Sequence, residues 1–527
     1  MNEELNVTEQ SAAPALKDFK VKPLFQKRSI DIIMAVFLFL LSVFGVSALF
    51  WDELNLGYTL VFDLAVIIIT AFLIKKGVKL CPSFVICGVL SLMCSWSFFI
   101  TSNTAVKAVS FIATLVSAIT WFISASGKEY ESGDYSLISY LFTAVSRAFG
   151  DIPPVFKSLF SKDKSKSKTA TNILLGILCA IPAVLIIVPI LANADYAFEA
   201  LINGLFVNYF TLIQKLILGT GVSIILAGIV FSLKYNTEQY STKELSVKAN
   251  NVSVSAFLCV LCGVYSVYLL SQLAYFFSAF SSILPKGYKF TYAQYARRGF
   301  FELCIIAVIN LVFIFLAIVI SEKKDGKIHL SIKLPATFTV AFTFAIIFTA
   351  LSKMVMYIGV YGCTVLRICT SAFMIWLFIL FICLLIRIFV KRFDFLRAGL
   401  VFALIILSVL GIGNVNRQIA RYNYNAYKQG KIKMDVEYMA DIGDEGVPYL
   451  YKLTKDKDSK IANKATTELN NKFMQYYDVT VPKKYMYSDL KKLKRTYKTL
   501  GEYSIPKARA YKALDEYAKS VHDILYD

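Results

Sequence analysis

Long runs of apolar residues alternate with short polar segments over most of this chain. Each run holds roughly 20 mostly apolar residues, the length of helix that crosses the hydrocarbon core of a bilayer. The runs are continuous in hydrophobicity, and a helix satisfies its own backbone hydrogen bonds in lipid, so spanning helices are predicted rather than spanning strands. We count eleven candidate spans, near residues 30–50, 57–74, 80–101, 105–124, 171–192, 210–233, 252–277, 299–320, 335–357, 364–390 and 397–413.

The composition supports an integral membrane protein. Hydrophobic residues make up 57% of the 527 residues and charged residues only 17%, which leaves too little polar surface for a soluble protein of this size. The polar tail 1–29 leads directly into a full-length apolar run, so we expect the first span to remain as an anchor. The predicted fold is all-α, a polytopic helical bundle over residues 30–413 with a small soluble helical domain at 414–527.

Positive charge falls in alternate loops, and this distribution predicts the orientation. The net charge is +20, and its basic segments recur on one side of the predicted bundle, which the positive-inside rule assigns to the cytoplasm. An odd number of spans then places the N-terminus in the cytoplasm and the C-terminal domain outside the cell membrane. The loop 284–299 disagrees, because its four cations fall outside; they have a partner there, or a span is miscounted. No nucleic-acid partner is indicated, since no soluble segment shows a basic face with interleaved aromatic residues.

Two further segments are neither spans nor ordinary loops. Apolar residues at helical spacing in 135–160 predict an amphipathic helix lying along the cytoplasmic interface. The basic linker 161–170 suits anionic lipid headgroups, although a solvated linker explains it equally well. The lipid bilayer, anionic lipids included, is therefore the first expected partner.

The C-terminal domain is predicted to consist of short amphipathic helices. Asp435 is placed to cap a helix that ends near Gly443, and Pro448 falls in the first turn of the next. Apolar residues then share one helix face between Leu490 and Leu500 and another between Leu514 and Leu525. The domain is long enough to have a modest core of its own.

Charged residues near the ends of the spans are the main candidates for function. Arg298 and Glu302 are four residues apart on one predicted helix face, and Arg367 falls about one turn into its span. Arg417 and Arg421 are also four apart, directly after the last span. If eleven spans is correct, these residues converge at the outer surface and form a collar that joins the C-terminal domain to the bundle. The bland alternatives are a local ion pair and an arginine that reaches the headgroups.

The usual catalytic constellations are not found. The two histidines, His329 and His522, lie in different parts of the chain, so no metal site, no catalytic triad and no cofactor is predicted. Asp63, about two turns into its span, is a candidate intramembrane carboxylate for protons or ions, or a hydrogen-bonded packing residue.

Three stretches, "YAQYARRGFFEL", "YIGVYGCTVLRICTSAFMIW" and "NVNRQIARYNY" followed by "DVEYMADIGDEGVPYLYKL", resemble the signature segments of a bacterial membrane family, domain of unknown function 4173, which is related to 4153. The resemblance covers roughly residues 290–450, and Cys363 departs from it where a larger apolar residue is expected. It implies a polytopic architecture and no established activity. With the arginines above, it gives these candidate ligand or coupling residues: Tyr295, Arg297, Arg298, Glu302, Tyr361, Thr364, Arg367, Asn414, Arg417, Arg421, Tyr422 and Asn423.

These features favour a non-enzymatic protein of the cell membrane. It could transport a solute along a path containing Glu302, Arg367 and Asp63, or it could sense or organise an envelope partner through the outer helical domain. The alternative is a membrane-embedded transferase acting on lipid-linked sugars at the outer face, with Asp52 and Glu53 in the first outer loop. That alternative rests on analogy of architecture alone.

Overall fold

The computed structural model describes residues 29–50, 54–77, 82–125, 209–232, 248–280, 300–323, 327–391, 393–477 and 503–526, with a few isolated positions between 187 and 198. Every named element in these ranges is an α-helix, which confirms the all-α fold. Apart from the isolated positions, the expected span 171–192 lies outside the described residues. So do the tail 1–28, the segment 135–160 and the linker 161–170.

Ten of the described helices are long and apolar enough to cross a membrane, and the protein is a multi-pass membrane protein. They are α1 (Ser29–Phe50), α2 (Leu56–Lys75), α3 (Pro82–Ile100), α4 (Thr104–Ala125), α9 (Tyr209–Ser232), α10 (Asn251–Phe280), α12 (Phe300–Ile320), α13 (Leu330–Tyr361), α14 (Val365–Phe389) and α15 (Phe395–Ile412). The shorter helices α16 (Val415–Lys428), α17 (Val436–Asp441), α18 (Val447–Leu453), α19 (Ser459–Tyr477) and α20 (Ile505–Tyr526) follow.

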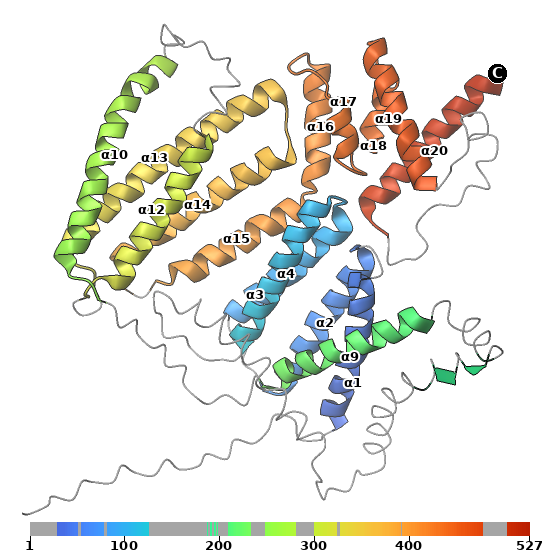
Figure 1. The fold of residues 1–527 in the computed structure, drawn as a ribbon, viewed down its shortest axis with the longest axis horizontal. Coiled ribbons are helices and arrows are strands. Elements are labelled where there is room, and N and C mark those ends of the chain that lie inside the picture. The colour runs from blue at the N-terminus through green and yellow to red at the C-terminus, as the bar shows by residue number, and fades with distance from the viewer. Residues whose placement is uncertain are drawn as a thin grey trace, which may run out of the picture.

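The spanning helices form two groups that lie side by side (Figure 1). One group contains α10, α12, α13 and α14, which share a large apolar core around Ile347 and Phe381. The other contains α1, α2, α3, α4 and α9. Helix α15 lies between the groups: it packs on α14 on one side, and on the other Leu404 packs against Leu90 and Cys94 of α3.

Helix α13 is longer than the span predicted from the sequence, because Pro335 lies within it. A proline has no backbone N–H, so the carbonyl of Ser331, one turn earlier, loses its helical partner. The hydroxyl of Ser255 on α10 donates to that carbonyl at 2.8 Å. This bond gives the carbonyl a partner, and the helix continues through the proline.

The direction of each helix follows from contacts at its ends. The end of the bundle from which α16 continues, called here the domain end, contains the α3–α4 turn and the α13–α14 turn. Helix α9 runs antiparallel to α1, since Lys215 near its start donates to Ser47 near the end of α1 at 2.8 Å. At its other end Phe231 packs edge-on against Phe72, near the end of α2. Helix α4 therefore ends at the far end of the bundle, whereas α9 begins at the domain end.

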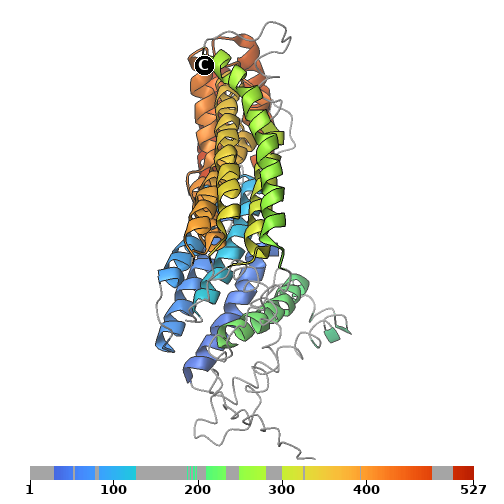
Figure 2. The ribbon, with the colours of Figure 1, turned by 90° about the vertical axis from the view of Figure 1, so that its left-hand side faces the viewer.

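Helices α16 to α20 gather at the domain end, at the upper right of Figure 1 and the top of Figure 2. Their core includes Leu450, Phe473, Tyr511 and Leu514, all fully buried, and it also contains Cys363 of the α13–α14 turn. The predicted caps are present: the Asp435 side chain accepts from the backbone N–H of Tyr438 at 3.0 Å, and Pro448 lies in the first turn of α18. The helix predicted between Leu490 and Leu500 lies outside the described residues.

Candidate functional site at the junction of the bundle and the C-terminal helices

The junction begins at Asn414, between α15 and α16. Its φ of 46° is in the left-handed region. Residues other than glycine rarely adopt this conformation, and asparagine is among those that tolerate it best. The buried amide then acts twice: Oδ1 caps α16 by accepting from the N–H of Arg417 at 3.0 Å, and Nδ2 donates to the carbonyl of Ile100 at 2.7 Å. Because Ile100 ends α3, this one side chain joins the start of α16 to a spanning helix.

A second asparagine of α16 holds the α13–α14 turn. Asn423 accepts from the backbone N–H of Cys363 at 2.7 Å and donates to the carbonyl of the same residue at 2.8 Å. Gly362 allows this approach, because its φ is 79° and a Cβ there would lie 2.8 Å from Asn423 Oδ1. Cys363 is buried in the core of the C-terminal helices, so the residue that departs from the expected motif lies at the contact itself.

The remaining contacts bind α16 to α17 and bind both groups of spanning helices to the domain. Asn416 donates to the carbonyl of Ile442 at 2.9 Å. The backbone N–H of Leu56, at the start of α2, donates to the carbonyl of Tyr503 just before α20, at 3.2 Å. The C-terminal helices are thus hydrogen-bonded to α2 and α3 of one group and to the α13–α14 turn of the other.

A buried carboxylate completes the junction. Glu445 is 5% exposed and reaches across to the α3–α4 turn, where it accepts from the N–H of Ser102 at 3.0 Å and from the Ser102 hydroxyl. Burial raises the pKa of the Glu445 carboxyl, and the hydrogen bonds from Ser102 oppose the shift only in part. The neighbouring Asp444 accepts from the hydroxyl of Tyr476, whose pKa is raised by burial and by that carboxylate, so the phenol remains a donor.

A cavity of about 180 Å³ opens beside Glu445. Its walls come from α16, the α17–α18 turn, α18 and α20, and its lining includes Arg417, Lys452, Arg509, Asp444 and Glu445. Among the described residues, neither guanidinium takes part in an ion pair. We call this cavity the junction pocket.

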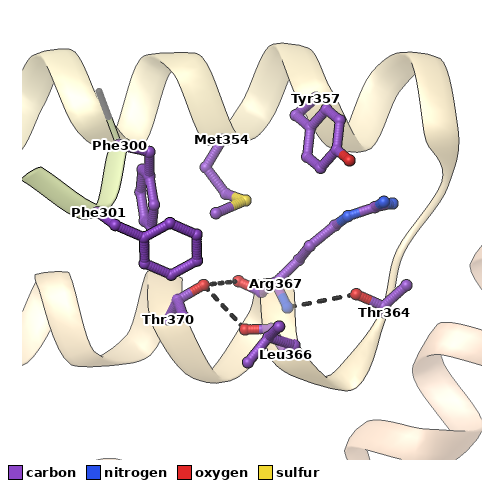
Figure 3. A pocket seen from close by; sticks show the side chains of 8 residues that line it. All are labelled: Phe300, Phe301, Met354, Tyr357, Thr364, Leu366, Arg367 and Thr370. Atoms are coloured by element: carbon purple, nitrogen blue, oxygen red, sulfur yellow. Dashed lines mark hydrogen bonds between the residues drawn. The ribbon is translucent and has the colours of Figure 1, made fainter. Parts of the chain in front are cut away.

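A second cavity, of about 210 Å³, lies at the same end between α12, α13 and α14 (Figure 3). Arg367, half-buried in the first turn of α14, lies over the ring of Tyr357 with 4.2 Å between the guanidinium carbon and the ring centroid. Thr364 caps the helix by accepting from the N–H of Arg367 at 3.4 Å. We call this cavity the Arg367 groove.

The structure places the described members of the predicted set at one end of the bundle, but in different roles. Asn414 and Asn423 are buried and hydrogen-bonded to backbone, whereas Arg421 and Tyr422 are exposed on α16. Glu302 lies in the first turn of α12 and interacts electrostatically with Lys353. Tyr361 is exposed at the end of α13. Tyr295, Arg297 and Arg298 lie outside the described residues.

Asp63 lies in the other group of helices, on α2. Its two carboxylate oxygens accept from the hydroxyl of Ser95 at 2.5 Å and from the indole N–H of Trp96 at 2.8 Å. Both roles that the sequence left open for Asp63, a proton or ion site and a hydrogen-bonded packing residue, stay predictions. Asp52 and Glu53 lie outside the described residues.

Sequence reasoning missed most of the junction pocket. Glu445 and Ser102 are separated by more than 300 residues, and no periodicity reports such a contact. The available signal was the stretch "DIGDEGVP", in which two adjacent carboxylates follow a glycine between two helices. Lys452 and Arg509 carried no signal, because lysine and arginine are common on soluble helices.

The family model for a domain of unknown function (DUF4153) matches residues 86–453, and the chain belongs to this family. The signature stretches indicated family 4173, whereas the model that matches is that of its relative 4153; the match reaches from α3 to the end of α18. No curated protein and no solved structure shows a match. The matched region ends just after the junction pocket residues of α18, so both α3 and its partners in α16 to α18 belong to the shared unit.

The Asn423 bonds give a direct stability test. Replacing Asn423 with alanine leaves the buried N–H and C=O of Cys363 without their partner, at a cost of about 1–3 kcal/mol for each unsatisfied group. We expect a lower thermal unfolding midpoint in detergent and faster amide hydrogen exchange in the α13–α14 turn. Asn425→Ala, an exposed substitution two residues along the same helix, is the matched control. Equal exchange in the two variants would contradict the clamp.

The raised pKa of Glu445 predicts a pH dependence with a definite sign. The folded protein holds the proton more tightly than the unfolded chain, so this residue favours folding most below its ordinary pKa of 4.5. Its contribution falls as the pH rises from there toward the raised pKa. We expect Glu445→Gln to match the wild type at pH 4.5 and to unfold at a higher temperature at neutral pH. A difference between the two midpoints that does not change with pH would refute the assignment.

Proposed function

We propose that this protein senses or organises an anionic component of the cell envelope, which binds outside the membrane in the junction pocket. The observation that carries the proposal is the meeting of three cations, Arg417, Lys452 and Arg509, in a cavity at the contact between the domain and the bundle. A guanidinium binds phosphate or carboxylate through two parallel N–H donors.

Positive charge exceeds negative charge in the pocket, with three cations against the two carboxylates of Asp444 and Glu445. Asp444 already accepts from Tyr476, and Glu445 already accepts from Ser102. Burial also favours the neutral form of Glu445 by raising its pKa. An anion in the pocket would therefore lie near three cations, while the two carboxylates beside it already accept hydrogen bonds from other residues.

Coupling to the membrane follows from where the pocket residues are attached. Arg417 belongs to α16, which continues directly from α15, the helix between the two groups of spans. Glu445 is bonded to the α3–α4 turn on the other side. If the domain and the bundle adopt two arrangements, a ligand that binds one of them more tightly shifts the equilibrium toward it. This is the thermodynamic requirement for a sensor.

An outer location for the domain is part of this proposal and has two supports. Helix α4 ends at the far end of the bundle and α9 begins at the domain end, which agrees with the one span that the sequence predicts between them, at 171–192. One crossing there gives the expected eleven. The far end also carries the basic residues that the positive-inside rule assigns to the cytoplasm: Lys75, Lys76, Lys323, Lys333, Arg387, Lys391 and Arg397.

Transport and sugar transfer receive less support. Asp63 belongs to a different group of helices from Glu302 and Arg367, and its carboxylate is engaged by Ser95 and Trp96. A transferase would depend on Asp52 and Glu53, for which the described residues provide no geometry.

Binding of a phosphate-bearing probe tests the function. Inorganic pyrophosphate, added at constant ionic strength to the full-length protein in detergent, should raise its thermal unfolding midpoint in a saturable manner. Removing one charge-assisted bond costs about 1.5–3 kcal/mol, so Arg417→Gln or Arg509→Gln should weaken binding roughly tenfold or more. Arg421→Gln changes the same charge outside the pocket and should have no effect. Equal losses in all three variants would indicate unspecific attraction and sink the proposal.

Cysteine labelling tests the sidedness. In a background without the ten native cysteines, Ser459→Cys and Lys519→Cys place exposed thiols on α19 and α20, whereas Lys391→Cys marks the far end. An impermeant maleimide should label the first two in intact cells and the third only after the cells are opened. The reverse pattern would place the domain in the cytoplasm.

A further inference from the structure

The Arg367 groove has the form of a lipid site rather than of a pocket for a soluble ligand. Figure 3 shows Phe300 and Phe301 of α12 facing Met354 of α13, with Arg367 of α14 beyond them toward the α13–α14 turn. Phe300 is 2% exposed, whereas Phe301 is 51% exposed. The groove therefore has a closed apolar floor and an apolar wall on the surface that lipid covers.

The Arg367 guanidinium lies at the end of the groove that is nearest the lipid headgroups. Arg367 is in the first turn of α14, at the domain end of a spanning helix, and its Nη1 donates to the carbonyls of Gly362 and Tyr361. A guanidinium has five N–H donors. The Nε and Nη2 groups make no hydrogen bond to the described residues and are left for an acceptor of another molecule.

A nearby lysine is balanced by a carboxylate. Lys353 is half-buried on α13, one residue before Met354 of the groove floor, and it interacts with Glu302 at the start of α12. Lys353 and Glu302 offset each other and do not line the cavity, so Arg367 supplies the positive charge, at the end of an apolar channel. An anionic phospholipid is complementary to that order of features, because its phosphate precedes its acyl chains in depth.

We propose that the Arg367 groove binds one anionic phospholipid, with the phosphate at Arg367 and an acyl chain along Phe300, Phe301 and Leu366. This site is separate from the junction pocket and goes beyond the function proposed above. The stacking on Tyr357 and the bonds to the turn fix the guanidinium before the lipid arrives, so little side-chain entropy remains to be lost on binding.

The experiment compares lipids that share their chains and differ in charge. Full-length protein is equilibrated with equal amounts of dioleoyl phosphatidylglycerol and dioleoyl phosphatidylcholine in mixed micelles, and retained lipid is counted by native mass spectrometry. Wild type should retain one phosphatidylglycerol preferentially. Arg367→Gln should reduce that preference roughly tenfold, and Arg421→Gln, an exposed arginine outside the groove, should leave it unchanged.

A blocking variant keeps the test valid if Arg367→Gln disturbs the turn. Leu366→Trp fills the groove from a side chain that is 66% exposed, and it should reduce retention of phosphatidylglycerol. Leu270→Trp, at a position 67% exposed on α10, is its matched control and should not. Equal retention of the two lipids by wild type, or unchanged retention in both groove variants, would overturn the proposal.

Discussion

Helix ends leave backbone groups without partners, and the asparagines of α16 supply those partners at the boundary of the bundle. Asn414 donates to the carbonyl of the last residue of α3, and Asn416 donates to the carbonyl that follows α17. Asn423 is hydrogen-bonded to both the N–H and the C=O of Cys363. Each bond involves one helix end, and together they fix the position of the C-terminal helices relative to the bundle. The bonds of Glu445 to Ser102 and of Leu56 to Tyr503 add to this attachment.

The same junction holds the two groups of spanning helices in register. Helix α15 packs between them within the membrane, whereas the domain reaches α2, α3 and the α13–α14 turn above it. The buried Glu445 adds a charged group to this contact, and burying a carboxylate is costly unless hydrogen bonds surround it. Ser102 supplies two of them. The polar arrangement at the junction therefore specifies one way of seating the domain, where an apolar surface would allow several.

Much of the fold could be predicted from the sequence, because hydropathy and caps are local signals. The ten described spans lie where the apolar runs indicated, and Asp435 and Pro448 mark the helices they predicted. Helix α13 was predicted too short, since its proline is compensated by Ser255 of another helix. The site was recovered only in part for the same reason. The arginines stand out against apolar neighbours, whereas the bonds of Asn423 and Glu445 join residues far apart in the chain.

The left-handed conformation at Asn414 fixes an elbow between α15 and α16. Because the residue is capped on one side and bonded to α3 on the other, the elbow has little freedom to straighten. Helix α16 is therefore attached rigidly to α15. A rotation of the C-terminal helices about the membrane normal would also turn α15, which packs against both groups of spanning helices.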